Sequence, residues 1–156
     1  MVSGPKVPES RPVGCVGFSP DNPNQVLCST SSQVLLWDIR EEKFNPLPIS
    51  DGSHIVTTSK MNQHGTSVAA GTMEGEVLLW DLRAMKILGN LKGRIGSPVS
   101  SLAFASDGPL LTSGARDGYV TVWDTTTNWM MRDLSIITNI LPTHLLFLED
   151  VLKMMI

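Results

Sequence analysis

Apolar and polar positions alternate in short runs along most of this 156-residue chain, and the runs recur at a fixed interval. Three near-copies of one apolar phrase, each closed by Trp-Asp, lie at residues 34–38, 77–81 and 120–124, so that their tryptophans are 43 residues apart both times. Short apolar runs bounded by turn residues predict β-strands, and a period of this length predicts a repeated supersecondary unit. Such a repeat indicates a binding surface rather than a single active site.

Each unit divides into four predicted strands. The first strands span 13–18, 56–61 and 99–104, the second 26–29, 68–71 and 110–113, the third are the Trp-Asp segments, and the fourth span 44–49, 87–91 and 129–134. The third strand is apolar at successive positions, which predicts burial on both faces. The Asp117-Gly118 pair indicates a hairpin turn, because glycine supplies the positive φ. The turn of the first unit, 30–33, lacks glycine, and we expect it to be one residue shorter, with a longer loop at 21–24 in compensation.

Four antiparallel strands per 43 residues, with Trp-Asp closing the third, resemble the WD40 repeat of β-propellers. The resemblance covers about residues 11–134 and implies an all-β fold, a partial WD40 propeller of three four-stranded antiparallel blades. The expected organisation is a flexible N-terminus at 1–10, repeats at 11–50, 51–93 and 94–134, and a non-repeat apolar tail at 135–156. A β-sandwich with a chance period would not explain why turns, strands and tryptophans keep one register.

The tail predicts a short amphipathic C-terminal helix. Pro142 and Thr143 mark its start, and its apolar side chains recur on one helical face: Leu145, Leu148, Val151, Leu152 and Met155. It is too short and too charged to span a bilayer. We expect it to pack over an exposed blade edge; a partner-binding or membrane-surface helix and a disordered or artefactual end are the alternatives.

The resemblance also implies a buried polar network of His, Ser or Thr, Asp and Trp in each blade. The third unit keeps Ser113, Asp117 and Trp123, but its Gly-His position reads Gly93-Arg94. In the second unit the serine position is Ala70 and the turn acid is Glu74, and His54 comes three residues late. No unit keeps every member, so we expect blades held mainly by apolar packing. The residues assigned to the structural repeat are Trp37, Asp38, Trp80, Asp81, Ser113, Asp117, Trp123 and Asp124.

Composition and motifs do not point to an enzyme. The formal net charge of −3 gives no broad attraction to nucleic acid. Cys15 and Cys28 have no metal-ligand spacing and indicate reduced, buried thiols; a disulfide or a reactive thiol is the alternative. We find no catalytic, cofactor-binding or metal-binding pattern and therefore expect no cofactor. Residues 1–12 lack the apolar core of a signal peptide, which favours an intracellular location, cytoplasmic or nuclear.

Two sets of residues are candidates for binding a partner. Trp-Asp-x-Arg occurs in the first two units, and the resemblance links such paired boxes to substrate receptors of cullin-based ubiquitin ligases, in which arginines such as Arg40 and Arg83 dock on an adaptor. On the other loop edge, Arg11, His54, Arg94 and Arg116 could meet an acidic or phosphorylated peptide. In both sets the alternative is a solvated surface residue.

The sequence therefore predicts a non-catalytic WD40 protein–protein interaction scaffold with protein partners. Propellers of this type close four to eight blades into a ring, and three blades cannot close. The open blade faces predict self-association, and loss of the repeat after Leu134 indicates a truncated form of a longer propeller. The alternatives are a ubiquitin-ligase substrate receptor and an unstable truncated isoform without independent function.

Overall fold

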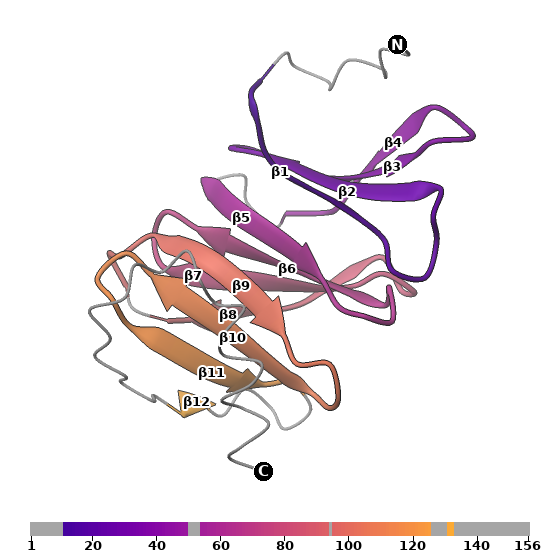
Figure 1. The fold of residues 1–156 in the computed structure, drawn as a ribbon. Helices are drawn as coiled ribbons and strands as arrows, with labels where there is room; N and C mark the ends of the chain where they lie inside the picture. Colours follow the sequence, from indigo (N-terminus) through magenta and orange to yellow (C-terminus); the bar gives the residue numbers. More distant parts are fainter. Residues whose placement is uncertain (1–10, 50–53, 94, 126–130, 133–156) are drawn as a thin grey trace.

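The computed structural model describes residues 11–49, 54–93, 95–125 and 131–132. In this part of the chain the regular elements are all strands, and they form three separate four-stranded antiparallel sheets. Figure 1 shows the three sheets stacked as neighbouring blades, with the first at the top of the view and the third at the bottom. The all-β prediction of three four-stranded blades is thereby confirmed. The predicted C-terminal helix lies outside the described residues.

Each blade is an up-and-down meander in which consecutive strands pair. The first blade consists of β1 (Val13–Phe18), β2 (Gln25–Thr30), β3 (Val34–Asp38) and β4 (Lys43–Pro46). The second consists of β5 (Val56–Met61), β6 (Ser67–Thr72), β7 (Glu76–Asp81) and β8 (Lys86–Lys92). The third consists of β9 (Val99–Phe104), β10 (Leu110–Ala115), β11 (Val120–Asp124) and β12 (Met131–Arg132).

The first blade differs from the others in its turns, as the sequence predicts. The turn between β2 and β3 is closed by Thr30 N–H donating to Gln33 O at 2.9 Å, whereas in the third blade Ala115 N–H reaches one residue further, to Tyr119 O. The loop between β1 and β2 is in turn one residue longer than the loops after β5 and β9. The missing glycine therefore shortens the turn without shifting the Trp-Asp strand out of register.

The fourth strands depart from the prediction. We expected an equivalent strand at 44–49 in the first blade, but β4 ends at Pro46. Proline has no backbone N–H to donate, so Pro46 and Pro48 remove two donors from this edge. β8 deviates in the opposite sense: it extends from Lys86 to Lys92 and is longer than the predicted 87–91. β12 covers only Met131 and Arg132 of the predicted 129–134, the rest of which lies outside the described residues.

Two apolar cores lie between the blades. We call the face of each blade that carries the tryptophan its leading face, and the opposite face its trailing face. The first core joins the trailing face of the first blade, with Leu27 and Leu36, to the leading face of the second, with Val68 and Trp80. The second core joins the trailing face of the second blade to the leading face of the third, around Trp123. Each blade thus seals the tryptophan of the one that follows it.

The third strands differ in how completely they are buried. In β3, Val34, Leu35 and Leu36 are at most 3% exposed, although Trp37 is only half-buried. In β7 the four residues from Val77 to Trp80 are at most 1% exposed. In β11 the trailing-face residues Val120 and Val122 are only half-buried. Burial on both faces, predicted from the apolar run, therefore holds in full for the central blade.

One glycine marks the closest approach between blades. A Cβ added to Gly71 of β6 would lie 2.4 Å from Cγ1 of Val99 in β9, a separation that real Cβ atoms do not show. Across the same contact, the Thr57 hydroxyl donates to the carbonyls of Gly71 and Val99. Glycine at 71 therefore lets the third blade pack directly against the backbone of the second.

Candidate interaction surfaces

The repeated aspartates organise the turns that follow the Trp-Asp strands. Asp38 Oδ1 accepts hydrogen bonds from the backbone N–H of Arg40 at 2.9 Å and of Glu41 at 3.1 Å. Asp81 Oδ1 repeats this with Arg83 at 2.8 Å and Ala84 at 3.3 Å. These carboxylates mimic a backbone turn, which is a common use of aspartate where a strand ends. Both carboxylates thus hold the turn that follows their strand.

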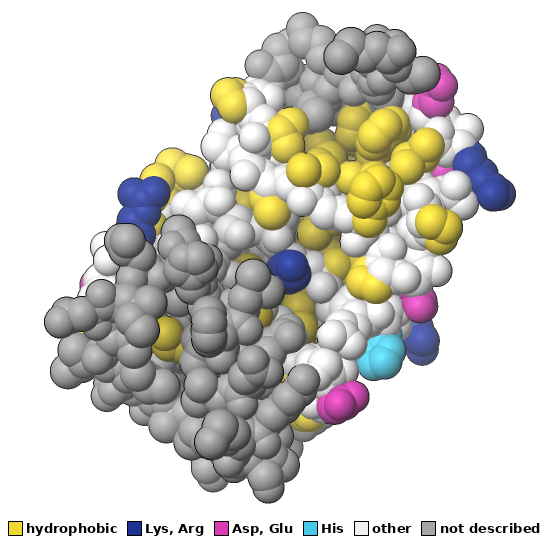
Figure 2. Space-filling view, viewed as in Figure 1, with side chains coloured by type: hydrophobic (Ala, Val, Ile, Leu, Met, Phe, Trp, Pro, Cys, Tyr) yellow, Lys and Arg dark blue, Asp and Glu magenta, His cyan; other side chains and the backbone are white. Residues whose placement is uncertain are grey.

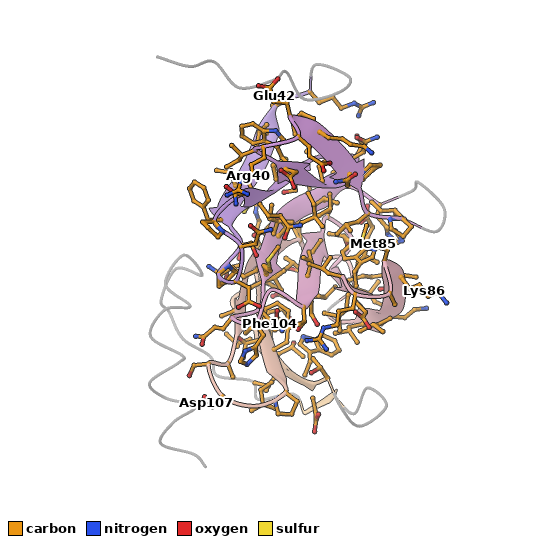
Figure 3. The ribbon with its side chains drawn as sticks, turned by 90° about the vertical axis from the view of Figure 1, so that its right-hand side faces the viewer. Arg40, Glu42, Met85, Lys86, Phe104 and Asp107 are labelled. Carbon is orange, nitrogen blue, oxygen red and sulfur yellow. The ribbon has the colours of Figure 1, made fainter. Side chains whose placement is uncertain are left out.

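These turns lie on one rim of the molecule together with the loops that join the first two strands of each blade. Backbone hydrogen bonds tie each turn to its loop: Ile39 N–H to Asn24 O, Leu82 N–H to Thr66 O, and Thr125 N–H to Pro109 O, at 2.8–2.9 Å. We call this surface the turn rim; it comprises residues 19–24, 39–42, 62–66, 82–85 and 105–109. Figure 3 shows this rim, with Arg40 and Glu42 labelled in the first blade, Met85 in the second and Asp107 in the third; Lys86 is the first residue of β8.

Arg40 and Arg83 occupy the same position in the turns of adjacent blades on this rim. Both side chains are exposed. Neither guanidinium has a hydrogen bond or an ion pair with any residue in the described ranges. Lys43 and Lys86, three residues further on in each turn, are exposed as well. The structure thus places the two arginines that the sequence singled out at equivalent turns of adjacent blades.

The opposite rim, which we call the hairpin rim, carries the second candidate set. Hydrogen bonds from Val56 N–H to Ser31 O and from Gly96 N–H, in the link before the third blade, to Glu74 O join consecutive blades there. Arg11 and Arg116 are exposed on this rim, and Arg94 lies outside the described residues.

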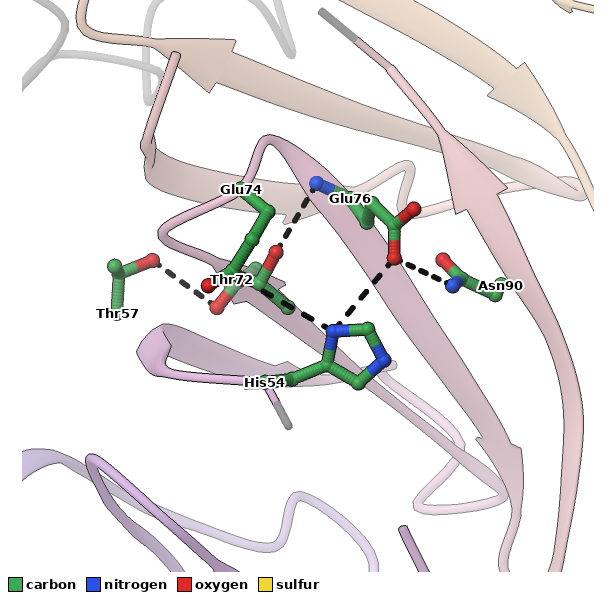
Figure 4. A network of polar contacts seen from close by, with 7 residues as sticks. His54, Thr57, Thr72, Glu74, Glu76 and Asn90 are labelled. Atoms are coloured by element: carbon green, nitrogen blue, oxygen red, sulfur yellow. Dashed lines mark hydrogen bonds and ion pairs between the residues drawn. The ribbon is translucent and has the colours of Figure 1, made fainter. Parts of the chain in front are cut away.

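His54 does not lie open on the hairpin rim. Its side chain is only 13% exposed, and Nδ1 lies 3.7 Å from Glu76 Oε2 and 4.0 Å from Glu74 Oε2 (Figure 4). Glu76 Oε2 also accepts a hydrogen bond from Asn90 Nδ2 at 2.6 Å, and the Glu76 N–H donates to the Thr72 hydroxyl. His54 is therefore part of the second blade's own polar packing.

This network was missed in the sequence because its members are out of the usual register. We expected no blade to hold a complete network, and the second blade indeed lacks the serine. It uses instead the histidine three residues late, the turn acid Glu74, and Glu76 at the start of β7. The available signal was an acidic residue directly before the second Val-Leu-Leu-Trp-Asp phrase.

The indole N–H groups of the three Trp-Asp tryptophans have three different environments. Trp123 Nε1 donates to Ser113 Oγ at 3.0 Å, inside its own blade, as the repeat implies. Trp80 Nε1 donates to the Pro48 carbonyl at 2.7 Å, in the link that follows the first blade. Trp37 Nε1 is out of contact with solvent and has no hydrogen-bond partner among the residues that the structure describes. Asp117 keeps its turn, accepting the Tyr119 N–H while its own N–H donates to Ser97 Oγ.

The chemistry of the cysteines is that of packed thiols. Cys15 and Cys28 are both free, and Cys15 Sγ donates to the Ser59 carbonyl at 3.2 Å. Burial raises the pKa of the Cys28 thiol, because the protein interior disfavours the thiolate. Within the described ranges, no group of three or more His, Cys, Asp or Glu side chains is placed to hold a metal ion. Among those residues no helix is long and apolar enough to cross a membrane.

The chain is similar in sequence to a known family of β-propeller domains. A family model described as "Nucleolar protein 10-like, N-terminal domain", a β-propeller, matches residues 47–141, which is 95 of the 156 residues. Comparison with curated protein sequences gives no match.

Solved structures share the fold. A chain of the mitotic checkpoint complex superposes with a TM-score of 0.68 at 20% sequence identity, over 83% of this chain and 40% of that one. U3-55K gives 0.67 at 21% over 76% and 38%, and the WD40 repeats of RRP9 give 0.65 at 21% over 76% and 37%. The chain therefore spans about 40% of the length of the propellers that it matches. The WD40 propeller fold predicted from the Trp-Asp period is confirmed.

Proposed function

Because this chain belongs to the family of nucleolar protein 10-like N-terminal β-propeller domains, we propose that it is a non-catalytic scaffold that binds protein partners through its turn rim. The supporting observation is the pair of exposed arginines, Arg40 and Arg83, at equivalent turns of adjacent blades. Their own Trp-Asp carboxylates are engaged with backbone N–H groups, so both guanidinium groups remain available to a partner.

Arginine suits this role for a physical reason. Its planar guanidinium can donate two parallel hydrogen bonds to one carboxylate, whereas the ammonium of lysine acts as a point charge. Two such groups held on rigid turns lose little conformational freedom when a partner binds. The expected partner surface is therefore a protein face with two carboxylates at matching positions.

A nuclear, and more specifically nucleolar, location belongs to the same proposal. It rests on the membership in a family of nucleolar protein 10-like domains, and the chain has no net positive charge that would favour direct binding to nucleic acid. We therefore expect protein partners inside an assembly. The mitotic checkpoint complex, in which one of the similar propellers was solved, is an example of such an assembly for that protein.

The same two arginines support a second candidate function. Paired Trp-Asp-x-Arg boxes resemble those of substrate receptors of cullin-based ubiquitin ligases, and here the two arginines are exposed at equivalent turns on one rim. In this case the partner at the turn rim is the ligase adaptor.

Affinity capture with a matched control tests both candidate functions, the scaffold and the ligase substrate receptor. The double variant Arg40→Ala/Arg83→Ala should lose a defined set of captured proteins. Lys43→Ala/Lys86→Ala removes the same charge from the first residues of β4 and β8, next to the turn rim, and should keep that set, because these exposed lysines cannot make bidentate contacts. Arg40→Lys/Arg83→Lys should lose most of it if bidentate contacts are needed.

The outcomes separate the candidates. A ligase adaptor among the lost proteins supports the receptor; its absence from the set, or its equal recovery with every variant, contradicts it. Unchanged capture by the double variant Arg40→Ala/Arg83→Ala would exclude the two arginines as the binding site. Each variant must first show a cooperative thermal melt, so that lost capture cannot be due to unfolding. A wild-type chain that does not melt cooperatively would contradict a scaffold acting on its own.

A further inference from the structure

The turn rim is not uniform in charge. Figure 2 shows acidic and basic side chains interspersed along the edge of the molecule that Figure 3 turns toward the viewer. The turn-rim segments of the first blade carry Arg40 and three carboxylates, which belong to Asp21, Glu41 and Glu42. Those of the second blade carry Arg83 and no carboxylate. Within this rim, the second blade is therefore the more attractive place for an acidic partner.

The two Trp-Asp-x-Arg turns share one backbone conformation but present different side chains. The residue two positions after each arginine is left-handed, with φ of 53° at Glu42 and 49° at Met85. Glycine adopts this conformation without steric cost, whereas a longer side chain is strained in it. Both side chains are exposed. The same strained position thus presents a carboxylate in the turn of Arg40 and an apolar thioether in the turn of Arg83.

These neighbours change what each arginine can bind. A partner carboxylate that approaches Arg40 is repelled by Glu41 and Glu42, which offset the attraction of the guanidinium. The two residues that follow Arg83 are uncharged and do not oppose an acid. One of them is Met85, and methionine is a flexible side chain that packs well on apolar groups of varied shape. The second turn therefore combines an unopposed guanidinium with an exposed apolar contact.

We propose that Arg83 and Met85 anchor the partner of the turn rim, and that this partner is a protein segment with a carboxylate next to an apolar side chain. This assignment rests on the scaffold function proposed above and divides that function unequally between the two arginines. The partner carboxylate accepts two parallel hydrogen bonds from the guanidinium, and the apolar side chain packs on the methionine. The carboxylates of the first blade, together with Asp107 of the third, disfavour a nucleic-acid backbone, which would bring several phosphates to the same rim.

Quantitative capture by single variants tests the unequal division. The probe is the set of proteins that the wild-type chain captures and Arg40→Ala/Arg83→Ala loses. Arg83→Ala should weaken the apparent affinity for that set at least about tenfold, as expected of an anchor residue, and Arg40→Ala less than about threefold. Equal losses with the two single variants would overturn the unequal division and leave the proposed function in place. Unchanged capture by the double variant would instead contradict the proposed function itself.

A glycine substitution at Met85 separates binding from folding. Met85→Gly removes the side chain and places glycine at a left-handed position, so it should not lower the melting temperature. It should nevertheless weaken capture by about threefold or more, because the apolar contact is lost. Glu42→Gly is the matched control: it makes the same backbone change in the first blade and should keep or increase capture, because it removes an acid. If Met85→Gly captures the set as well as the wild type does, Met85 is not part of the anchor and the proposal is wrong.

Peptides identify the chemistry of the partner. Overlapping peptides that tile the captured proteins should bind the wild-type chain where an aspartate or glutamate lies next to an apolar residue. Replacing either of these two residues by alanine should abolish the binding, and Arg83→Ala should bind none of these peptides. If no peptide binds, or if the bound peptides lack an acid, the partner is not such a segment and the proposal fails. Capture that disappears after nuclease treatment of the extract would also overturn it, in favour of RNA.

Discussion

The first and second blades carry nearly the same leading face, yet only that of the second blade is completed by a neighbour. Val26 and Val68 each pair with the tryptophan of their blade, and both are at most 5% exposed. At the inner edge the two faces differ, since Phe18 is 70% exposed and Met61 7%. The tryptophans differ too, because Trp80 has the Pro48 carbonyl and Trp37 has no acceptor. A neighbouring blade thus supplies both apolar cover and a hydrogen-bond acceptor.

The largest expected effect comes from truncating the tryptophans. Trp80→Ala should lower the free energy of unfolding by about 3–5 kcal/mol, the usual range for a buried aromatic residue. Trp37→Ala should lower it clearly less, because Trp37 is only half-buried and already bears an unpaired N–H. Urea denaturation at a concentration at which the chain is monomeric measures both. Should Trp80→Ala not fold, Trp80→Phe and Trp37→Phe give the same comparison, and equal losses would remove the distinction between the two faces.

The second largest effect is expected from a substitution at the contact between the second and third blades. Gly71→Ala should destabilise the chain by about 1–3 kcal/mol, because the new methyl group overlaps Val99 of the third blade. Gly17→Ala in β1 is the control: no atom lies within 4 Å of its added Cβ, and the effect should stay within about 0.5 kcal/mol. Chemical denaturation checks both. A neutral Gly71→Ala would mean that the second and third blades do not pack as closely as described.

Indole pairing can be tested in the third blade. Ser113→Ala should cost about 1–3 kcal/mol, since it leaves Trp123 Nε1 buried without its acceptor. Adding Trp123→Phe should then cost less than it does in the wild type, because the unpaired donor is removed with the indole. A double-mutant cycle measures this coupling. Additive effects would show that the hydrogen bond contributes nothing beyond packing.

The smallest effect concerns Cys28, which lies on the first blade's leading face opposite Leu35. Burial raises the pKa of this thiol in the folded chain above that in the unfolded chain. Its contribution to stability is therefore complete below the unfolded pKa of about 8.5 and is lost as the pH rises through the folded pKa.

Unfolding free energies between pH 7 and strongly alkaline pH should show this decline for the wild type. Cys28→Ala reproduces the alanine found at the equivalent position 70 and should flatten the profile. An identical alkaline decline in Cys28→Ala would assign it to other groups.

Much of the fold could be predicted from the sequence because the signal repeats. The first strands at 13–18, 56–61 and 99–104 coincide with β1, β5 and β9, and the shortened turn at 30–33 follows from the absence of glycine. The fourth strands were less predictable. They are edge strands with one partner, so their ends depend on local features such as Pro46 rather than on the repeat.

The candidate binding residues also divide into those that could be predicted from the sequence and those that could not. Arg40 and Arg83 could be found from their motif, because Trp-Asp fixes a turn whose geometry is local. The position of His54 could not, because its contacts with Glu74 and Glu76 join segments that are about 20 residues apart in the sequence.

The sequence by itself determined the number of blades, the strand order and the residues that close each turn. All of these depend on hydrogen bonds and periodicity between neighbouring parts of the chain. Only the tertiary structure decided which face of each blade is sealed, where each indole N–H finds its acceptor, and that Gly71 must have no side chain. These depend on contacts between blades, where Leu27 meets Trp80 and Gly71 meets Val99 across the stack. Equivalent residues in the repeat, such as Trp37 and Trp80, therefore have different environments.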